Sequence, residues 1–172
     1  HVRKINLNPL SLIDLIVPAE KKTIKQTGLP PGTLVYVGPK RQKKTKISVI
    51  DYNEDTCEEK ELRNIEECEQ YKNKKSVSWI NIEGIEEVDI IEKVNNYFGI
   101  HPLVAEDILN TNQRPKVDDY DQYIFICLKM LLLDEKKNKI VSEHVSIILG
   151  EGYVLTFQES IGDVFDIIRE RI

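Results

Sequence analysis

Glu106 and Asp107 are adjacent carboxylates that could bind a hard cation. Carboxylate oxygens are the ligands that Mg²⁺ and Ca²⁺ prefer, whereas zinc prefers nitrogen and sulfur. Neighbouring residues of a helix point about 100° apart, so these two side chains cannot grip one ion as residues four apart can. Each carboxylate therefore needs further ligands from elsewhere, and on spacing alone a solvated helix face is the better explanation of the pair.

Signatures of other chemistry are missing from the sequence. The three histidines share no ligand spacing, and His144 lies inside a strand pattern, where a structural role is expected. The three cysteines contain no Cys-x-x-Cys pair for zinc, and we expect reduced thiols in a cytosolic setting. No Walker loop, dinucleotide fingerprint or nucleophile elbow occurs. The residues therefore indicate no catalytic centre and no bound cofactor other than a metal ion.

Length and composition indicate a single globular domain. The chain has 172 residues, of which 41% are hydrophobic, enough to bury a core. Its net charge of −5 argues against nucleic acid as a partner, because phosphate binding needs a basic face. No run of 18 apolar residues occurs, so no segment is expected to span a bilayer, and no signal peptide is found.

The elements that position the carboxylates combine strands and helices. A helix over 102–109 carries both carboxylates, with Pro102 in its first turn, and a helix over 86–97 ends before Gly99. Residues 1–27 are interpreted as an N-terminal extension, and 54–71 as a polar helix. A last helix is expected from Asp163 as N-cap. Strands are expected over 33–37, 47–52, 76–82, 120–133, 140–149 and 153–157. This order favours an α/β (α+β) domain with helices on both faces of a sheet.

One stretch resembles a known family. The segment FGIHPLVAEDILN at 98–110, followed by QRPKV at 113–117, closely resembles the signature of the cytoplasmic domain of CorA magnesium channels. Similar segments occur in matching order at 28–36, 78–82, 129–130, 145–148 and 162–172. The resemblance therefore covers the chain from about Gly28 to its end.

The resemblance implies a fold and an assembly. Members of the family are homopentamers with a cytoplasmic funnel, a long stalk helix and two membrane helices in the cell inner or plasma membrane. Residues 28–172 would form the funnel domain, a three-layer α/β/α sandwich around a mixed, largely antiparallel sheet, truncated where the stalk helix begins. The Gly-Met-Asn pore signature is absent, since Leu131 follows Met130. We therefore expect a domain that is not an enzyme, lies on the cytoplasmic side, and is monomeric or weakly associated by itself.

The resemblance also assigns roles to the two carboxylates. Asp107 resembles the carboxylate of the main regulatory site between protomers, and Glu106 resembles a ligand of a second site. Mg²⁺ bound there, or Co²⁺ or Ca²⁺ in its place, keeps such channels closed. Two alternatives stay open: the funnel of a related zinc transporter, and a metal-dependent hydrolase with Glu106 as base, which lacks a clustered second set of ligands. The sequence leaves Mg²⁺, Co²⁺, Ni²⁺ and Zn²⁺ open as the transported ion.

Overall fold

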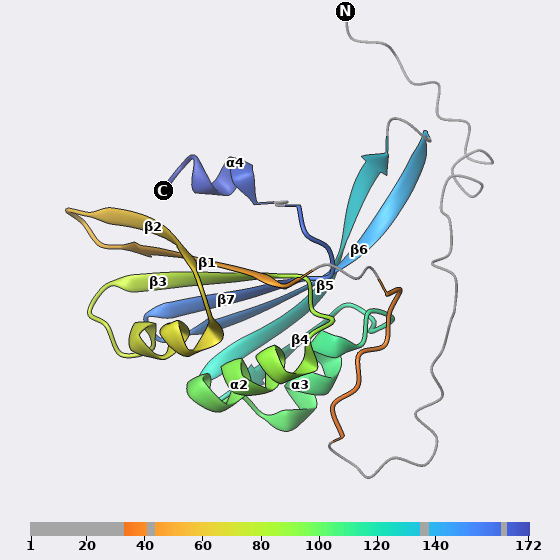
Figure 1. Cartoon of the computed structure of the whole chain (residues 1–172), viewed down its shortest axis with the longest axis horizontal. Coiled ribbons are helices and arrows are strands. Elements are labelled where there is room, and N and C mark those ends of the chain that lie inside the picture. The colour runs from red at the N-terminus through yellow and green to blue at the C-terminus, as the bar shows by residue number, and fades with distance from the viewer. Residues whose placement is uncertain (1–32, 41–43, 135–137, 163–164) are drawn as a thin grey trace, which may run out of the picture.

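The computed structural model describes residues 33–40, 44–134, 138–162 and 165–172 (Figure 1). Within them, strands form one seven-stranded sheet in the order β2-β1-β3-β7-β6-β5-β4. Neighbouring strands are antiparallel except for β3 and β7, which are parallel. The strands are β1 (Lys46–Tyr52), β2 (Cys57–Leu62), β3 (Val77–Glu83), β4 (Lys116–Tyr120), β5 (Tyr123–Asp134), β6 (Lys139–Gly150) and β7 (Tyr153–Gln158).

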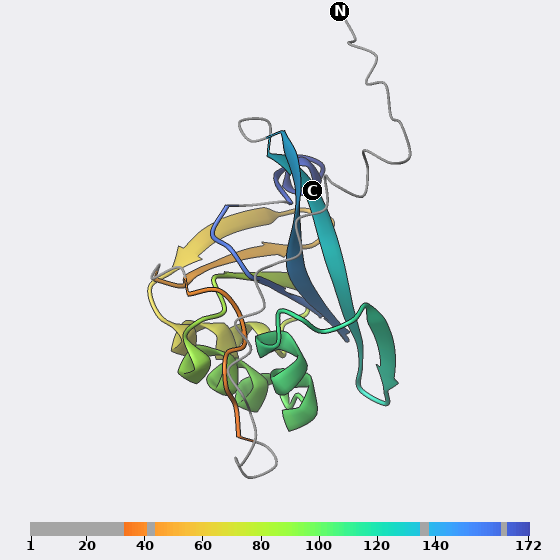
Figure 2. The same cartoon turned by 90° about the vertical axis from the view of Figure 1, so that its right-hand side faces the viewer.

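Helices cover both faces of this sheet (Figures 1 and 2). The 3-10 helix η1 (Ile65–Tyr71), α2 (Val88–Phe98) and α3 (Pro102–Leu109) lie on one face, and the short α4 (Asp166–Arg169) lies on the other. The predicted α/β class, with a mixed and largely antiparallel sheet between helical layers, is confirmed.

The core is divided by the sheet into two clusters of buried side chains. Successive strand residues point to opposite faces, so Ile80 and Ile82 of β3 pack in the larger cluster, whereas Trp79 packs in the smaller one. The larger cluster includes Phe98, and the smaller one includes Phe165 just before α4. The layer that contains α2 and α3 therefore rests on the larger core.

The predicted polar helix over 54–71 is wrong in its first half. Residues 57–62 form the edge strand β2, whose one partner among the described strands is β1, and η1 follows. Asn53 starts this hairpin because its Oδ1 accepts hydrogen bonds from the backbone N–H groups of Asp55 and Thr56, both at 2.9 Å. Charged residues suit an edge strand, where they face solvent and discourage pairing with another chain.

The predicted strand over 33–37 is also wrong, and it has a different role. Only Val37 makes a β-type contact, an isolated bridge to Asn110. Its N–H donates to the carbonyl of Leu109 at 2.9 Å, and its carbonyl accepts from the N–H of Thr111 at 2.9 Å. The segment thus satisfies backbone groups where α3 ends.

Several other differences concern element boundaries. The predicted strand over 120–133 corresponds to β5, which begins at Tyr123. Strand β4, which precedes it and is separated from it by a turn after Tyr120, was not predicted. The last helix begins at Asp166, and the predicted N-cap Asp163 lies outside the described residues, as does the extension 1–27. The division at Gly28 stays a prediction.

None of the helices within the described residues is both long and apolar enough to cross a bilayer.

Candidate functional site

Helix α3 holds the two predicted metal ligands on its outer side. Pro102 is its first residue, and His101 is its N-cap, whose Nδ1 accepts a hydrogen bond from the N–H of Leu103 at 3.2 Å. The residues of α3 that pack into the protein are Val104, Ala105, Ile108 and Leu109. This apolar face leaves Glu106 and Asp107 half-buried, between the core and the surface.

Asp107 forms an ion pair with a lysine that the sequence analysis did not assign to the site. Nζ of Lys116, in β4, lies 2.6 Å from Oδ2 of Asp107 and 2.7 Å from Oδ2 of Asp118. Lys116 and Asp118 are two positions apart on one strand and so share a face. The side chain of Asp107 is only 18% exposed, and that of Lys116 32%. One ammonium group therefore lies between two carboxylates at the edge of α3.

The two carboxylates keep Lys116 charged. Partial burial by itself lowers the pKa of Lys116, but the hydrogen bonds and charges of Asp107 and Asp118 outweigh it and raise this pKa well above its usual value. The ammonium also lies 5.6 Å from the centroid of the Phe125 ring. The three charged groups carry a net charge of −1, so the site is acidic but partly neutralised.

Glu106 is placed differently from Asp107. Its backbone carbonyl accepts from the N–H of Asn110 at 3.0 Å, and no hydrogen bond or ion pair of its carboxylate is found among the described residues. Within the same part of the chain, no group of three or more histidine, cysteine or acidic side chains could hold a metal ion. The structure thus puts both predicted ligands on one helix without giving either a complete ligand set.

The donor chemistry of Asp107 nevertheless fits a hard cation. Two carboxylates around one positive charge define a place where a cation is stabilised, and oxygen donors are those that Mg²⁺ prefers. A complete Mg²⁺ site would need further oxygen ligands from water or from another chain.

A buried histidine supports α3 from the side of the sheet. His144 of β6 is fully buried, its Nε2 lies 3.2 Å from Oγ of Ser146, and its Nδ1 lies 3.8 Å from Sγ of Cys127. Burial, assisted by the charge of Lys129, lowers the pKa of His144 to about 4, and backbone groups of Ile108 and Asp107 oppose this shift. A neutral, buried imidazole agrees with the expected structural role.

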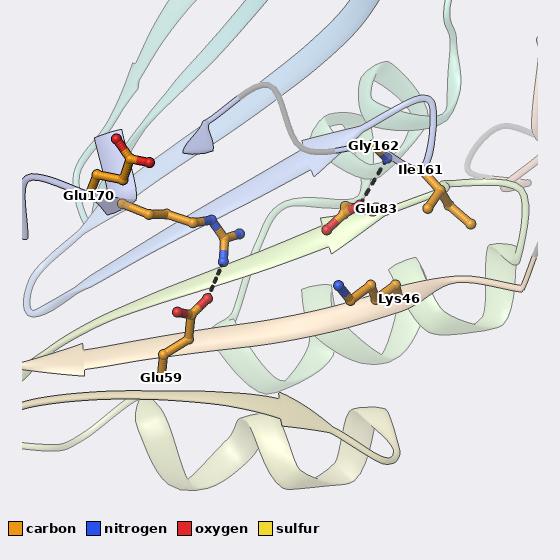
Figure 3. Close-up of a pocket in the computed structure, with 7 residues that line it drawn as sticks. Lys46, Glu59, Glu83, Ile161, Gly162 and Glu170 are labelled. Atoms are coloured by element: carbon orange, nitrogen blue, oxygen red, sulfur yellow. Dashed lines mark hydrogen bonds and ion pairs between the residues drawn. The ribbon is translucent and has the colours of Figure 1, made fainter. Parts of the chain in front are cut away.

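An open pocket of about 550 Å³ lies away from these carboxylates, beside α4 on the opposite face of the sheet (Figure 3). Nη1 of Arg169 lies 2.7 Å from Oε1 of Glu59, and the N–H of Gly162 donates to Oε2 of Glu83 at 3.0 Å. The guanidinium of Arg169 also covers the Trp79 ring at 5.2 Å. The contacts of Arg169 hold α4 against the sheet. The residues that line the pocket therefore serve to attach α4.

Sequence reasoning missed Lys116 and Asp118. Both lie within or beside the QRPKV segment, and the spacing Lys-x-Asp on a strand places them on one face. That signal was lost because β4 was not predicted.

The fold is shared with solved structures. It is similar to the structure of the full-length CmaX protein, with a TM-score of 0.58 and 8% identity, covering 76% of this chain and 40% of that one. It is also similar to the ZntB cytoplasmic domain from Vibrio parahaemolyticus, with a TM-score of 0.54 and 11% identity, covering 74% and 49%. At these identities the likeness shows a shared α/β fold.

Sequence comparison then gives the family. The model of the family described as "CorA-like Mg2+ transporter protein" matches residues 74–172. The chain is 46% identical over 153 residues to the cobalt/magnesium transport protein CorA of Thermotoga maritima, covering 89% of this chain and 43% of that protein. The chain therefore belongs to the CorA-like Mg²⁺ transporter family, as the resemblance indicated.

Two consequences follow from this membership. The matched relative is named as a transport protein, so the prediction that the chain is not an enzyme is confirmed. The chain also spans less than half the length of that relative.

Proposed function

We propose that this chain is the cytoplasmic Mg²⁺-sensing domain of a CorA-type channel that moves Mg²⁺, and also Co²⁺, across the cell inner or plasma membrane. The observation that carries the proposal is the 46% identity, along 89% of the chain, to a protein named for cobalt and magnesium transport. The chain would contribute regulation, and membrane helices of the parent protein would contribute the pore.

Asp107 would hold the regulatory Mg²⁺ between neighbouring protomers of a homopentamer, and Glu106 would serve a second site. Both carboxylates lie on the outer side of α3, whose inner face is fixed by the core. Acidic side chains from two protomers repel each other without a cation and are bridged when one binds. Mg²⁺ retains much of its hydration shell, so contacts through water and a modest affinity are expected.

A transport assay on the full-length parent tests this function. The parent reconstituted in liposomes should admit Mg²⁺, and the rate should fall as Mg²⁺ rises on the side that carries this domain. Replacing both Glu106 and Asp107 by alanine should keep uptake high at Mg²⁺ concentrations that close the unmodified parent. The proposal fails if the parent moves no divalent cation, or if the doubly substituted protein closes at the same concentration.

The isolated 172-residue chain should be monomeric or weakly associated at micromolar concentration. Its proposed contact surface carries carboxylates of the same charge, which repel between copies. Sedimentation velocity with and without MgCl₂ measures the association directly. A stable pentamer of this chain alone would contradict the expectation and would show that its own surfaces supply the assembly energy.

A further inference from the structure

We propose that Lys116 is a built-in counter-ion that competes with the divalent cation for Asp107 and so sets the Mg²⁺ concentration at which the regulatory site fills. This inference rests on the proposed function, because it concerns the same carboxylate. It adds a residue of this chain that tunes the response without being a metal ligand.

The position of the ammonium carries the argument. Nζ of Lys116 contacts Oδ2 of Asp107 at 2.6 Å, which is the hydrogen-bonded distance of a close ion pair. A divalent cation bound to the same carboxylate would place two further positive charges beside this ammonium, and like charges at such distances repel strongly. Mg²⁺ and the ammonium therefore compete for Asp107, and filling of the site is opposed as long as Lys116 keeps this position.

Lys116 is better fixed than an ordinary surface lysine. It lies in β4, where it pairs with Cys127 of β5, and its ammonium lies 5.6 Å from the Phe125 ring centroid. Its side chain is 32% exposed, against 50% for Lys93, which forms a simple surface ion pair with Glu66 at 2.6 Å. The fold therefore holds the ammonium of Lys116 beside Asp107, where it competes with a divalent cation for this carboxylate.

Asp118 gives the displaced ammonium a second position. Its Oδ2 lies 2.7 Å from Nζ of Lys116, so the lysine can leave Asp107 and still keep one carboxylate partner. This lowers the cost of displacement compared with a lysine that would be left partly buried without any carboxylate partner. Asp107, Lys116 and Asp118 can thus adopt two arrangements. In one, both carboxylates share the ammonium; in the other, the ammonium pairs with Asp118 and Mg²⁺ binds Asp107.

Substitutions of Lys116 and of Asp118 should shift the Mg²⁺ concentration for closure in opposite directions. Lys116→Met removes the competitor, and the Mg²⁺ concentration for half-closure should fall about tenfold, equivalent to about 1.4 kcal/mol. Asp118→Asn removes the second position of the ammonium, so the same concentration should rise severalfold. Lys116→Arg keeps the charge and should shift the concentration less than Lys116→Met does.

The experiment is protease protection of the full-length parent across a MgCl₂ titration. It compares the unmodified protein with Lys116→Met, Lys116→Arg, Asp118→Asn and Asp107→Ala. Lys93→Met is the matched control, since it removes a lysine from an ion pair of equal length between α2 and η1. Thermal unfolding of each variant of this chain shows which ones fold.

The outcomes separate this inference from the function on which it rests. A lower half-closure concentration for Lys116→Met, with Lys93→Met unchanged, supports the inference. An unshifted curve for Lys116→Met, while Asp107→Ala flattens the response, overturns it and leaves the proposed function standing. If Asp107→Ala has no effect, the proposed site itself is wrong. If Lys116→Met does not fold, Asp118→Asn decides, and an unshifted curve for that variant overturns the inference.

Discussion

Lowering the pH from 7 to 4.5 should remove about 2–3 kcal/mol from the free energy of unfolding through His144 alone. Burial and the charge of Lys129 lower the pKa of this imidazole to about 4 in the folded protein. A free histidine has a pKa of about 6.5. Between these values the unfolded chain binds a proton that the folded chain excludes, so stability decreases as the pH falls through this range.

Chemical unfolding at several pH values isolates this effect. Ion-paired carboxylates also lose their stabilisation in acid, but they do so equally in variants that retain them. His144→Gln cannot gain the proton, so it should start less stable at pH 7 and lose less stability on acidification than the unmodified chain. Ser146→Ala is the matched control, because it removes the hydroxyl 3.2 Å from Nε2 but keeps the titrating ring. Parallel losses in the unmodified chain and in His144→Gln would show that His144 does not titrate in this range.

The sequence specified some elements of the fold through local signals of clear physical origin. Helix α3 could be predicted because Pro102 pre-sets the first turn, and α2 because Gly99 supplies the left-handed C-cap, with φ of 68°. The hairpin of β5 and β6 could be predicted from two long runs of apolar residues, aromatic and aliphatic in β5 and mostly β-branched in β6, joined by a charged segment.

Elements that depend on their place in the sheet could not be predicted in the same way. The sequence CEEKEL of β2 does not alternate between apolar and polar residues. Five of its six residues are exposed on an edge strand, so burial imposes no such pattern on them. Its strand conformation comes from pairing with β1. The segment around Val37 has strand-like composition, yet its hydrogen bonds go to the end of α3, a partner about 70 residues away that no local pattern reveals.

In the candidate site, too, local features could be predicted from the sequence, whereas tertiary contacts could not. The chemistry of Glu106 and Asp107 follows from their residue type, and their place on one helix follows from its pattern. The pairing of Asp107 with Lys116 depends on how α3 lies against β4 and β5, which is a tertiary relationship. The support of α3 by His144 also arises from packing between distant segments, and a histidine in a strand pattern indicates only burial.

Asp107→Ala should weaken Mg²⁺-dependent closure of the full-length parent while changing the stability of this chain little. Asp107 is the sixth of the eight residues of α3, and no acidic residue lies in its first turn. A negative charge near the C-terminal end of a helix is unfavourable with respect to the helix dipole, so Asp107 does not serve to start the helix. Its measurable structural contribution is the ion pair with Lys116, which keeps Asp118 as a partner after the substitution. Such partly exposed pairs contribute at most about 1 kcal/mol.

The effect on closure should be much larger, because the substitution removes the carboxylate that we propose as a ligand of the bridging ion. Loss of groups that merely orient metal ligands already weakens binding about 10–100-fold, so half-protection should require at least about tenfold more Mg²⁺. Removing one carboxylate also lowers the repulsion between protomers, so the protection curve should become shallower as well as shift. Asp89→Ala in the first turn of α2 is the matched control, an exposed helical carboxylate whose loss should leave the curve in place. The paired measurement is thermal unfolding of this chain and protease protection of the parent across a Mg²⁺ titration. If Asp107→Ala lowers the melting temperature strongly and leaves the protection curve unmoved, Asp107 is a structural residue, and the ion that closes the channel binds elsewhere.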